Sequence, residues 1–248
     1  MKNVIVIKKK IKKFSKEIQI EGDKSLSIRW ALLASQCDGK STAFNLLKSE
    51  DVLNTLKCLK KLGIKVNILS DKCEIFGLGL NQFKYDKIIN LNTGNSGTLS
   101  RLIMGLLVHS KNKIIIRGDK SLSKRDFWRI IHPLKKFGAT FKSNNGKLPI
   151  EMEGTKNSIP ILYHEKKGSA QCKSAVMLAA LNTQGETVIK AKKSRNHTEL
   201  LFKYLKLKIK IKKQKKMDII RIKGQKKIKP FNYKIPSDIS SSAFFIVL

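Results

Sequence analysis

The sequence predicts an α/β (α+β) chain built from repeated βαβαββ units, and three observations support this prediction. An apolar segment of helical length recurs with a spacing of 74 residues, ending at Leu33, Leu107 and Leu181. Each copy begins after a polar loop that contains glycine. The second helix of the unit and the strand after it repeat as well, since Leu59–Val66 matches Leu134–Phe141, with a degenerate third copy further on. Such a period indicates one αβ unit used three times.

The first copy follows two short β-type runs, Asn3–Ile7 and Glu17–Glu21, which are joined by a basic linker. A polar loop, Gly22–Ser25, then leads into an apolar stretch of helical length. Ser49 is expected to cap the second helix, because two acidic residues follow it in the first turn and suit the helix dipole. The expected elements are helices over Ser25–Gln36 and from Ser49 to Leu62, and strands over Thr42–Leu46, Ile64–Leu69 and Cys73–Phe76.

The second copy repeats this order with clearer signals at its helix starts. Its loop, Thr93–Thr98, carries two glycines and opens directly into an apolar run. Ser123–Asp126 matches the capping-box pattern at the start of a helix that ends near Phe137. The first helix of this copy is expected from Gly97 to Val108, with strands over Ile88–Leu91, Ile114–Arg117, Ala139–Lys142 and Leu148–Met152.

The third copy and the end of the chain complete the pattern. Asn196 is expected to cap a helix over Thr198–Leu205, with Glu199 returning the bond as in a capping box. The other expected elements are a helix over Ser169–Leu181 and strands over Ile159–Tyr163, Thr187–Ala191, Leu207–Ile211, Asp218–Ile222 and Tyr233–Pro236. A last loop, Ser237–Ala243, opens an apolar helix that stops at Leu248. Because such a short apolar helix has little to pack on, the sequence is expected to be an N-terminal fragment.

Composition restricts the classes of function. The net charge is +34, but the cations are 45 Lys and only 7 Arg, spread along the chain, so nucleic-acid binding is kept only as a minor alternative. No run is long enough to cross a membrane and no signal peptide is visible. Four cysteines without a CxxC pair indicate reduced core residues in a cytoplasmic protein, and the histidines lack metal-ligand spacing.

The repeated loops suit an anionic ligand. Glycine lets the backbone come close to a ligand, and a helix N-terminus offers unpaired N–H groups and the positive end of the dipole. Four of the seven arginines, Arg29, Arg101, Arg125 and Arg195, lie in or beside these openings. Arginine can hold a phosphate or carboxylate with two parallel hydrogen bonds, which lysine cannot do. The alternatives are well-capped helices and surface ion pairs, and for Arg101 a structural role is favoured.

Five stretches together resemble the 5-enolpyruvylshikimate-3-phosphate (EPSP) synthase family, that is, 3-phosphoshikimate 1-carboxyvinyltransferase. They are GDKSLSIRWALLAS, LNTGNSGTLSRL, GDKSLSKR, SAQCKSAVMLAALNTQGET and SRNHTE, and the last two are similar to the class II branch. The resemblance implies an enolpyruvyl transferase-like fold of two globules, each an inside-out α/β barrel-like body of three repeats. One globule would span 21–230 in repeats of about 21–85, 86–155 and 156–225. Residues 1–20 and 231–248 would belong to a truncated second globule.

The resemblance implies transfer of the enolpyruvyl group from phosphoenolpyruvate to the 5-hydroxyl of shikimate 3-phosphate, with release of phosphate. It implies a catalytic Lys24 shared by both substrates, no cofactor or metal, and a monomer. The main base would lie in the missing part, so this chain alone is expected to be inactive. The implied ligands of shikimate 3-phosphate are Lys24, Ser25, Arg29, Ser169, Ala170, Gln171 and Arg195. The implied ligands of phosphoenolpyruvate are Lys24, Asn95, Gly97, Thr98, Arg125 and Gln171.

One residue departs from the family pattern, since Asp126 stands where proline is usual, and its carboxylate is expected to weaken phosphate binding by Arg125. Two other classes of function stay open. A basic nucleic-acid-binding module would lose affinity steeply with salt. An α/β interaction protein would bind neither small anion.

Overall fold

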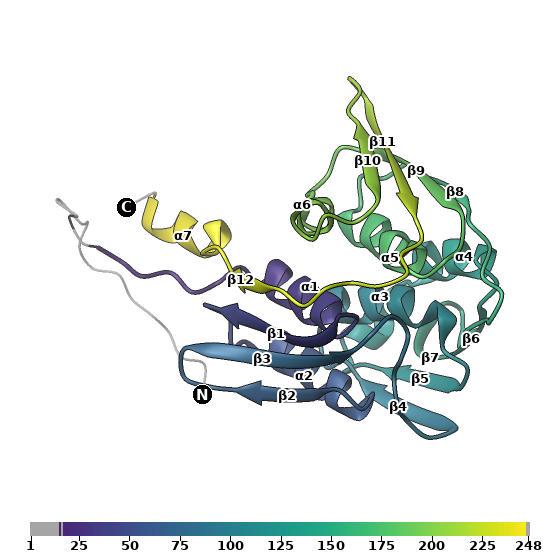
Figure 1. The fold of residues 1–248 in the computed structure, drawn as a ribbon, viewed down its shortest axis with the longest axis horizontal. Coiled ribbons are helices and arrows are strands. Elements are labelled where there is room, and N and C mark those ends of the chain that lie inside the picture. The colour runs from purple at the N-terminus through teal and green to yellow at the C-terminus, as the bar shows by residue number, and fades with distance from the viewer. Residues whose placement is uncertain (1–14, 16, 247–248) are drawn as a thin grey trace.

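Three four-stranded sheets surround the buried helices α1 (Lys24–Ala34), α3 (Gly97–Leu106) and α5 (Ala170–Ala180) in a computed structural model (Figure 1). The structure describes Ser15 and residues 17–246. The expected strand at Asn3–Ile7 lies outside this range. None of the helices in the described part is long and apolar enough to cross a membrane.

The three sheets have the same topology, with one parallel pair at an edge and antiparallel pairs elsewhere. The first sheet has the order β12 (Asn232–Lys234), β1 (Asp38–Phe44), β3 (Lys72–Leu78), β2 (Lys65–Ile68). The second has the order β4 (Ile88–Asn92), β5 (Lys113–Arg117), β7 (Lys147–Glu153), β6 (Thr140–Asn144). The third has the order β8 (Leu162–Glu165), β9 (Glu186–Lys192), β11 (Met217–Lys223), β10 (Ile209–Lys212).

The first sheet obtains its edge strand from the far end of the chain. In the other two sheets, β4 and β8 precede the buried helix and pair in parallel with the strand after it. In the first sheet this place is taken by β12, which pairs in parallel with β1 and aligns Thr42 with Asn232. Residues before and after the three repeats also meet, because Gly22 and Ser237 form an isolated antiparallel bridge. The expected strand at Glu17–Glu21 is wrong, because these residues form no strand and the isolated bridge lies at the next residue, Gly22.

The three central helices lie at the centre of the core and are buried on nearly all sides. Helices α3 and α5 come close together because Gly105 has no side chain. A Cβ atom at this position would lie 2.1 Å from the carbonyl oxygen of Ala175. The helices α2 (Glu50–Lys61), α4 (Trp128–Lys136) and α6 (His197–Tyr204) each bury one face and expose the other.

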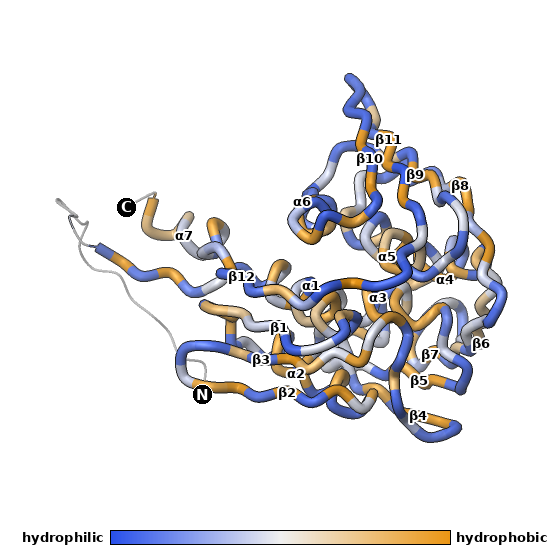
Figure 2. The backbone as a smooth tube through the Cα atoms, in the orientation of Figure 1, coloured by the Kyte–Doolittle hydropathy of each residue, from blue (hydrophilic) through white to orange (hydrophobic). Residues whose placement is uncertain are grey.

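Helix α7 (Ile239–Ile246) follows the bridge at Ser237 and confirms the apolar helix expected at the end of the chain. Apolar residues, drawn in orange, recur along it in Figure 2. Ile239, Phe244 and Ile246 are among the most exposed large apolar side chains of the described residues.

Most element bounds agree with the sequence within a few residues, but the expected caps were partly wrong. Helix α4 begins at Trp128, and the Trp128 N–H donates to Asp126 Oδ1 at 2.8 Å. Ser123 belongs instead to a short 3-10 helix, η2 (Leu122–Lys124), and its hydroxyl donates to the Gly118 carbonyl. A second 3-10 helix, η1 (Leu107–His109), ends α3. Ser49 and Asn196 occupy the N-cap positions of α2 and α6 without accepting a side-chain cap bond.

The fold class is confirmed as mixed α/β, with one correction. Each sheet has its own four strands, and no strand pairing between sheets joins the described residues into a closed barrel. The barrel-like shape that the family resemblance implied is therefore three separate sheets around a helical centre.

Candidate active site

The N-terminal ends of the three central helices carry the loops that the sequence singled out. Each helix is capped by a side chain that accepts a backbone N–H bond from its first turn. Asp23 caps α1 at 2.7 Å, and Ser96 and Ser169 cap α3 and α5, both at 3.3 Å. These caps fix where each helix begins and hence where the residues after the cap point.

A cavity of about 340 Å³ lies between these helix starts. Its lining residues are Lys24, Asp51, Asn95, Gly97, Thr98, Arg125 and Gln171. The structure thus brings together all six residues that the resemblance implied for phosphoenolpyruvate, although they come from three different repeats. Two cations and one carboxylate line the cavity, so its formal charge favours an anion.

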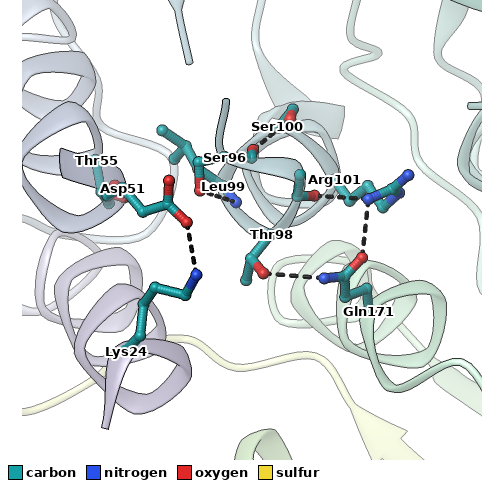
Figure 3. A network of polar contacts seen from close by, with 10 residues as sticks. Lys24, Asp51, Thr55, Ser96, Thr98, Leu99, Ser100, Arg101 and Gln171 are labelled. Carbon is teal, nitrogen blue, oxygen red and sulfur yellow. Dashed lines mark hydrogen bonds and ion pairs between the residues drawn. The ribbon is translucent and has the colours of Figure 1, made fainter. Parts of the chain in front are cut away.

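The carboxylate is Asp51, which the sequence interpretation regarded only as an acidic residue in a first helical turn. Its Oδ2 lies 3.0 Å from Lys24 Nζ (Figure 3). The Asp51 side chain is 21% exposed and the Lys24 side chain is 48% exposed. The ion pair joins α2 to α1 at the wall of the cavity. No local pattern marked Asp51 as a site residue, because its partner lies on another helix.

On the opposite side, Arg101 and Gln171 connect α3 to α5 (Figure 3). Arg101 Nη1 donates to Gln171 Oε1 at 2.9 Å and to the Gly97 carbonyl at 3.1 Å. Gln171 Nε2 donates to Thr98 Oγ1 at 2.9 Å. The Arg101 guanidinium also lies over the Phe127 ring, with 4.9 Å from Cζ to the ring centroid. Burial is the main cause that lowers the pKa of Arg101 below its ordinary value.

Arg125 extends to the cavity from the segment after η2 and is exposed. The neighbouring Asp126 accepts the Trp128 N–H at the start of α4 through its Oδ1. Among the described residues, Arg125 and Asp126 form no ion pair within 4.0 Å. The expectation that Asp126 weakens phosphate binding by Arg125 stays a prediction.

The residues implied for shikimate 3-phosphate lie mostly outside this cavity. Ser25 follows Lys24 in the first turn of α1, and Ala170 and Gln171 begin α5 directly after its cap Ser169. Arg195 is an exposed residue of the loop before α6. Lys24 and Gln171 are the two members of this set that line the cavity.

Arg29 is 4% exposed and holds three parts of the chain together. It donates to Thr198 Oγ1 at 2.9 Å, to the Ser25 carbonyl at 3.0 Å and to Ser174 Oγ at 3.2 Å. Burial, partly offset by Glu199, lowers the pKa of Arg29 to about 10, so the guanidinium stays charged at neutral pH. The structure therefore places Arg29 beneath the helix starts, with much of its donor capacity already used.

A buried ion pair that the sequence did not reveal lies beside Arg29. Lys173 Nζ contacts Glu199 Oε1, and both side chains are almost completely buried. Glu199 was expected to return a capping bond at the start of α6, and this expectation is wrong because its carboxylate faces Lys173 on α5. Removing one partner of such a pair would leave an unpaired buried charge.

No group of three or more His, Cys, Asp or Glu side chains suitable for a metal ion occurs among residues 17–246. The four cysteines are buried and free, as the sequence predicted. Burial raises the pKa of Cys37 and of Cys58 to about 12, so these thiols are protonated at neutral pH.

The chain is similar to known proteins in both sequence and fold. The family model for EPSP synthase (3-phosphoshikimate 1-carboxyvinyltransferase) matches residues 8–248. The chain is 42% identical over 231 residues to the 3-phosphoshikimate 1-carboxyvinyltransferase of Vesicomyosocius okutanii, covering 93% of this chain and 52% of that protein. It is 37% identical over 241 residues to the Desulforamulus reducens protein of the same name, covering 96% and 55%.

A solved structure of EPSP synthase from Acinetobacter baumannii superposes with a TM-score of 0.84 at 33% sequence identity, covering 93% of this chain and 52% of that chain. The chain thus spans about half the length of the curated relatives it matches. The family model covers nearly the whole chain, and both sequence and fold agree with it. The chain belongs to the EPSP synthase family.

Proposed function

We propose that this chain carries sites for shikimate 3-phosphate and phosphoenolpyruvate and takes part in enolpyruvyl transfer between them. The reaction joins the enolpyruvyl carbon of phosphoenolpyruvate to the 5-hydroxyl oxygen of shikimate 3-phosphate and releases inorganic phosphate. The observation that carries the proposal is the cavity of about 340 Å³ where Lys24, Asn95, Gly97, Thr98, Arg125 and Gln171 meet.

In this proposal the two cations of the cavity hold the anionic groups of phosphoenolpyruvate. Arg125 offers a planar guanidinium that can bind a phosphate through two N–H bonds. Lys24 carries three N–H donors and can give a proton to the reacting enolpyruvyl group. Asn95, Thr98 and Gln171 add neutral donors, and Gly97 lets the ligand approach the backbone. The ion pair between Asp51 and Lys24 weakens when Lys24 binds an anion.

Shikimate 3-phosphate is proposed to bind next to this cavity, over the starts of α1 and α5. Ser25, Ser169, Ala170 and Arg195 would contact it, and Lys24 and Gln171 would lie between the two substrates. Arg29 would contribute its remaining donors and keep α5 and α6 in place, as its bonds to Ser174 and Thr198 support. The chain is proposed to be a cytoplasmic monomer that acts without a cofactor.

A thermal-shift experiment tests this proposal against the alternatives. Shikimate 3-phosphate should raise the melting temperature in proportion to the logarithm of its concentration, because it binds the native state. Shikimate without the phosphate should raise it much less. An equal or larger shift with a polynucleotide that vanishes at high salt would favour nucleic-acid binding instead. No shift with any of these ligands would contradict the proposal.

A further inference from the structure

One Arg101 nitrogen contacts two oxygens at the edge of the cavity. Arg101 Nη1 donates to the Gly97 carbonyl at 3.1 Å and to Gln171 Oε1 at 2.9 Å (Figure 3). Gly97 lies on α3 and Gln171 on α5, in different repeats. Arg101 itself does not line the cavity, whereas Gln171 and Thr98 do. Arg101 can therefore influence a ligand in the cavity through these neighbours and through its positive charge, but not by direct contact.

The chemistry of arginine fixes how the Gln171 amide is turned. A guanidinium has only N–H donors, so the group facing Arg101 must be an acceptor. The amide oxygen of Gln171 therefore faces Arg101, and its NH₂ group faces Thr98, whose Oγ1 lies 2.9 Å away. With the amide reversed, two donor groups would face each other at Arg101, and one hydrogen bond would be lost.

The same order of donors and acceptors extends to Thr98. Its hydroxyl oxygen accepts an N–H from Gln171, so its own O–H is free to donate elsewhere. Thr98 and Gln171 both line the cavity. An anion there accepts hydrogen bonds and offers none, so it needs donors around it.

We propose that Arg101 is a positioning residue that sets the direction of the chain Arg101–Gln171–Thr98, so that the Thr98 hydroxyl and the second Gln171 N–H donate to an anion in the cavity. This proposal deepens the proposed function and rests on it for the identity of the anion, phosphoenolpyruvate.

The surroundings hold Arg101 in this position. The guanidinium lies over the Phe127 ring, which is itself fully buried. Gly97 leaves the space that the guanidinium occupies, since a Cβ atom there would lie 2.7 Å from Arg101 Nη1. A side chain at position 97 would displace the nitrogen that orients Gln171. The absence of a side chain at Gly97 therefore helps to set the direction of the hydrogen bonds from Arg101 through Gln171 to Thr98. It also lets a ligand approach the backbone.

A double-mutant cycle tests the proposal on the 248-residue chain, with phosphoenolpyruvate titrated in the presence of saturating shikimate 3-phosphate. Thr98→Val should weaken binding roughly tenfold, because it removes a hydrogen bond to a charged ligand. In an Arg101→Met background the same Thr98→Val change should weaken binding by less than about threefold, since the hydroxyl is no longer directed. An equal effect of Thr98→Val in both backgrounds would overturn the proposal.

Three further variants separate positioning from general damage. Arg117→Met changes another arginine, which lies at the exposed end of β5 and donates to Asn90, and should leave the Thr98→Val effect at roughly tenfold. Arg101→Lys keeps a donor-only side chain and should restore part of the binding lost in Arg101→Met. Gln171→Glu offers only acceptors to Thr98, so it should abolish binding even though it can still accept from Arg101.

A measurement without any ligand separates this proposal from the proposed function. The side-chain NH₂ signals of Gln171 in a ¹⁵N NMR spectrum should shift in both Arg101→Met and Thr98→Val, and not in Arg117→Met. If Arg101→Met leaves these signals unchanged, Arg101 does not orient Gln171, whichever ligand binds. If the signals shift as expected but no anion binds, the hydrogen-bond direction is supported and the proposed function is contradicted.

Discussion

Lys24 Nζ and Asp51 Oδ2 lie 3.0 Å apart, which places an ion pair between the starts of α1 and α2 at the wall of the cavity. Asp51 is the one carboxylate among the residues that line this cavity. Its negative charge compensates the positive charge of Lys24 while the cavity holds no anion. The same negative charge repels an anion that enters. The same pair therefore lowers anion affinity and keeps the Lys24 ammonium at the cavity.

Asp51→Asn tests the first of these effects. Removing the negative charge should tighten phosphoenolpyruvate binding by about two- to fivefold, the modest size expected for a partly exposed pair. Calorimetric titration in the presence of shikimate 3-phosphate measures it. Glu50→Gln removes a neighbouring exposed carboxylate that does not line the cavity and should change the affinity less. Weaker binding in Asp51→Asn would show instead that Asp51 is needed to orient Lys24.

Arg125→Lys tests the assignment of the phosphate-binding arginine. Lysine keeps the charge but loses the planar, two-bond geometry, so phosphoenolpyruvate affinity should fall roughly tenfold or more. The affinity for shikimate 3-phosphate should change little, because Arg125 is proposed to face the other substrate. Equal losses of affinity for the two ligands would show that Arg125 does not bind phosphoenolpyruvate specifically.

Gly105→Ala tests the close packing of α3 against α5. The new Cβ atom would lie 2.1 Å from the Ala175 carbonyl oxygen and 2.9 Å from Ala175 Cα. These are backbone atoms, so the helices themselves must move apart. The free energy of unfolding should fall by about 1–3 kcal/mol or more, as measured by urea denaturation. Gly79→Ala, whose Cβ would meet Gln82 at 3.6 Å, is a control for an added methyl group outside the core, although its positive φ adds some strain.

His109 should make stability depend on pH. Burial lowers the pKa of His109 to about 4 from an ordinary value of 6.5, so the folded chain keeps this histidine neutral. Its Nε2 lies 2.7 Å from Ser158 Oγ and 3.2 Å from Thr183 Oγ1. As pH falls from 6.5 towards 4, only the unfolded chain takes up this proton, so the free energy of unfolding should decrease by about 3 kcal/mol.

His109→Gln should remove this part of the pH dependence while other groups still titrate. The test compares the slope of unfolding free energy against pH, from urea denaturation between pH 4 and 6.5, in the two proteins. His164→Gln changes an exposed histidine on β8 and should leave the slope as in the original chain. An unchanged slope in His109→Gln would show that His109 is protonated in the folded state as readily as in the unfolded state.

The local elements were largely predictable from the sequence, because periodic apolar residues and glycine loops act over a few neighbouring positions. Helices α1, α3 and α5 were expected within a few residues of their observed bounds. The 74-residue spacing also predicted three equivalent helix starts, each after a loop that contains glycine. The family resemblance of the sequence motifs implied six of the residues that line the cavity, namely Lys24, Asn95, Gly97, Thr98, Arg125 and Gln171.

Interactions between distant side chains were not predictable in this way. Arg101 and Gln171 are 70 residues apart, and their hydrogen bond depends on how α3 packs against α5. Asp51 lacks any local mark of its contact with Lys24. The parallel pairing of β12 with β1 joins the two ends of the globule, which no periodic pattern encodes. At α6, Glu199 fits a capping pattern locally, but pairing with the buried cation of Lys173 outweighs one exposed capping bond.

Calorimetric titration of shikimate 3-phosphate into the 248-residue chain tests whether the helix starts bind its phosphate, with shikimate as the matched ligand that lacks the phosphate. We expect saturable one-to-one binding of shikimate 3-phosphate. We also expect at least roughly tenfold weaker binding of shikimate, because the phosphate forms charge-assisted bonds at the helix starts. Equal affinity for the two ligands, or no heat from either, would show that this chain does not carry the proposed phosphate site.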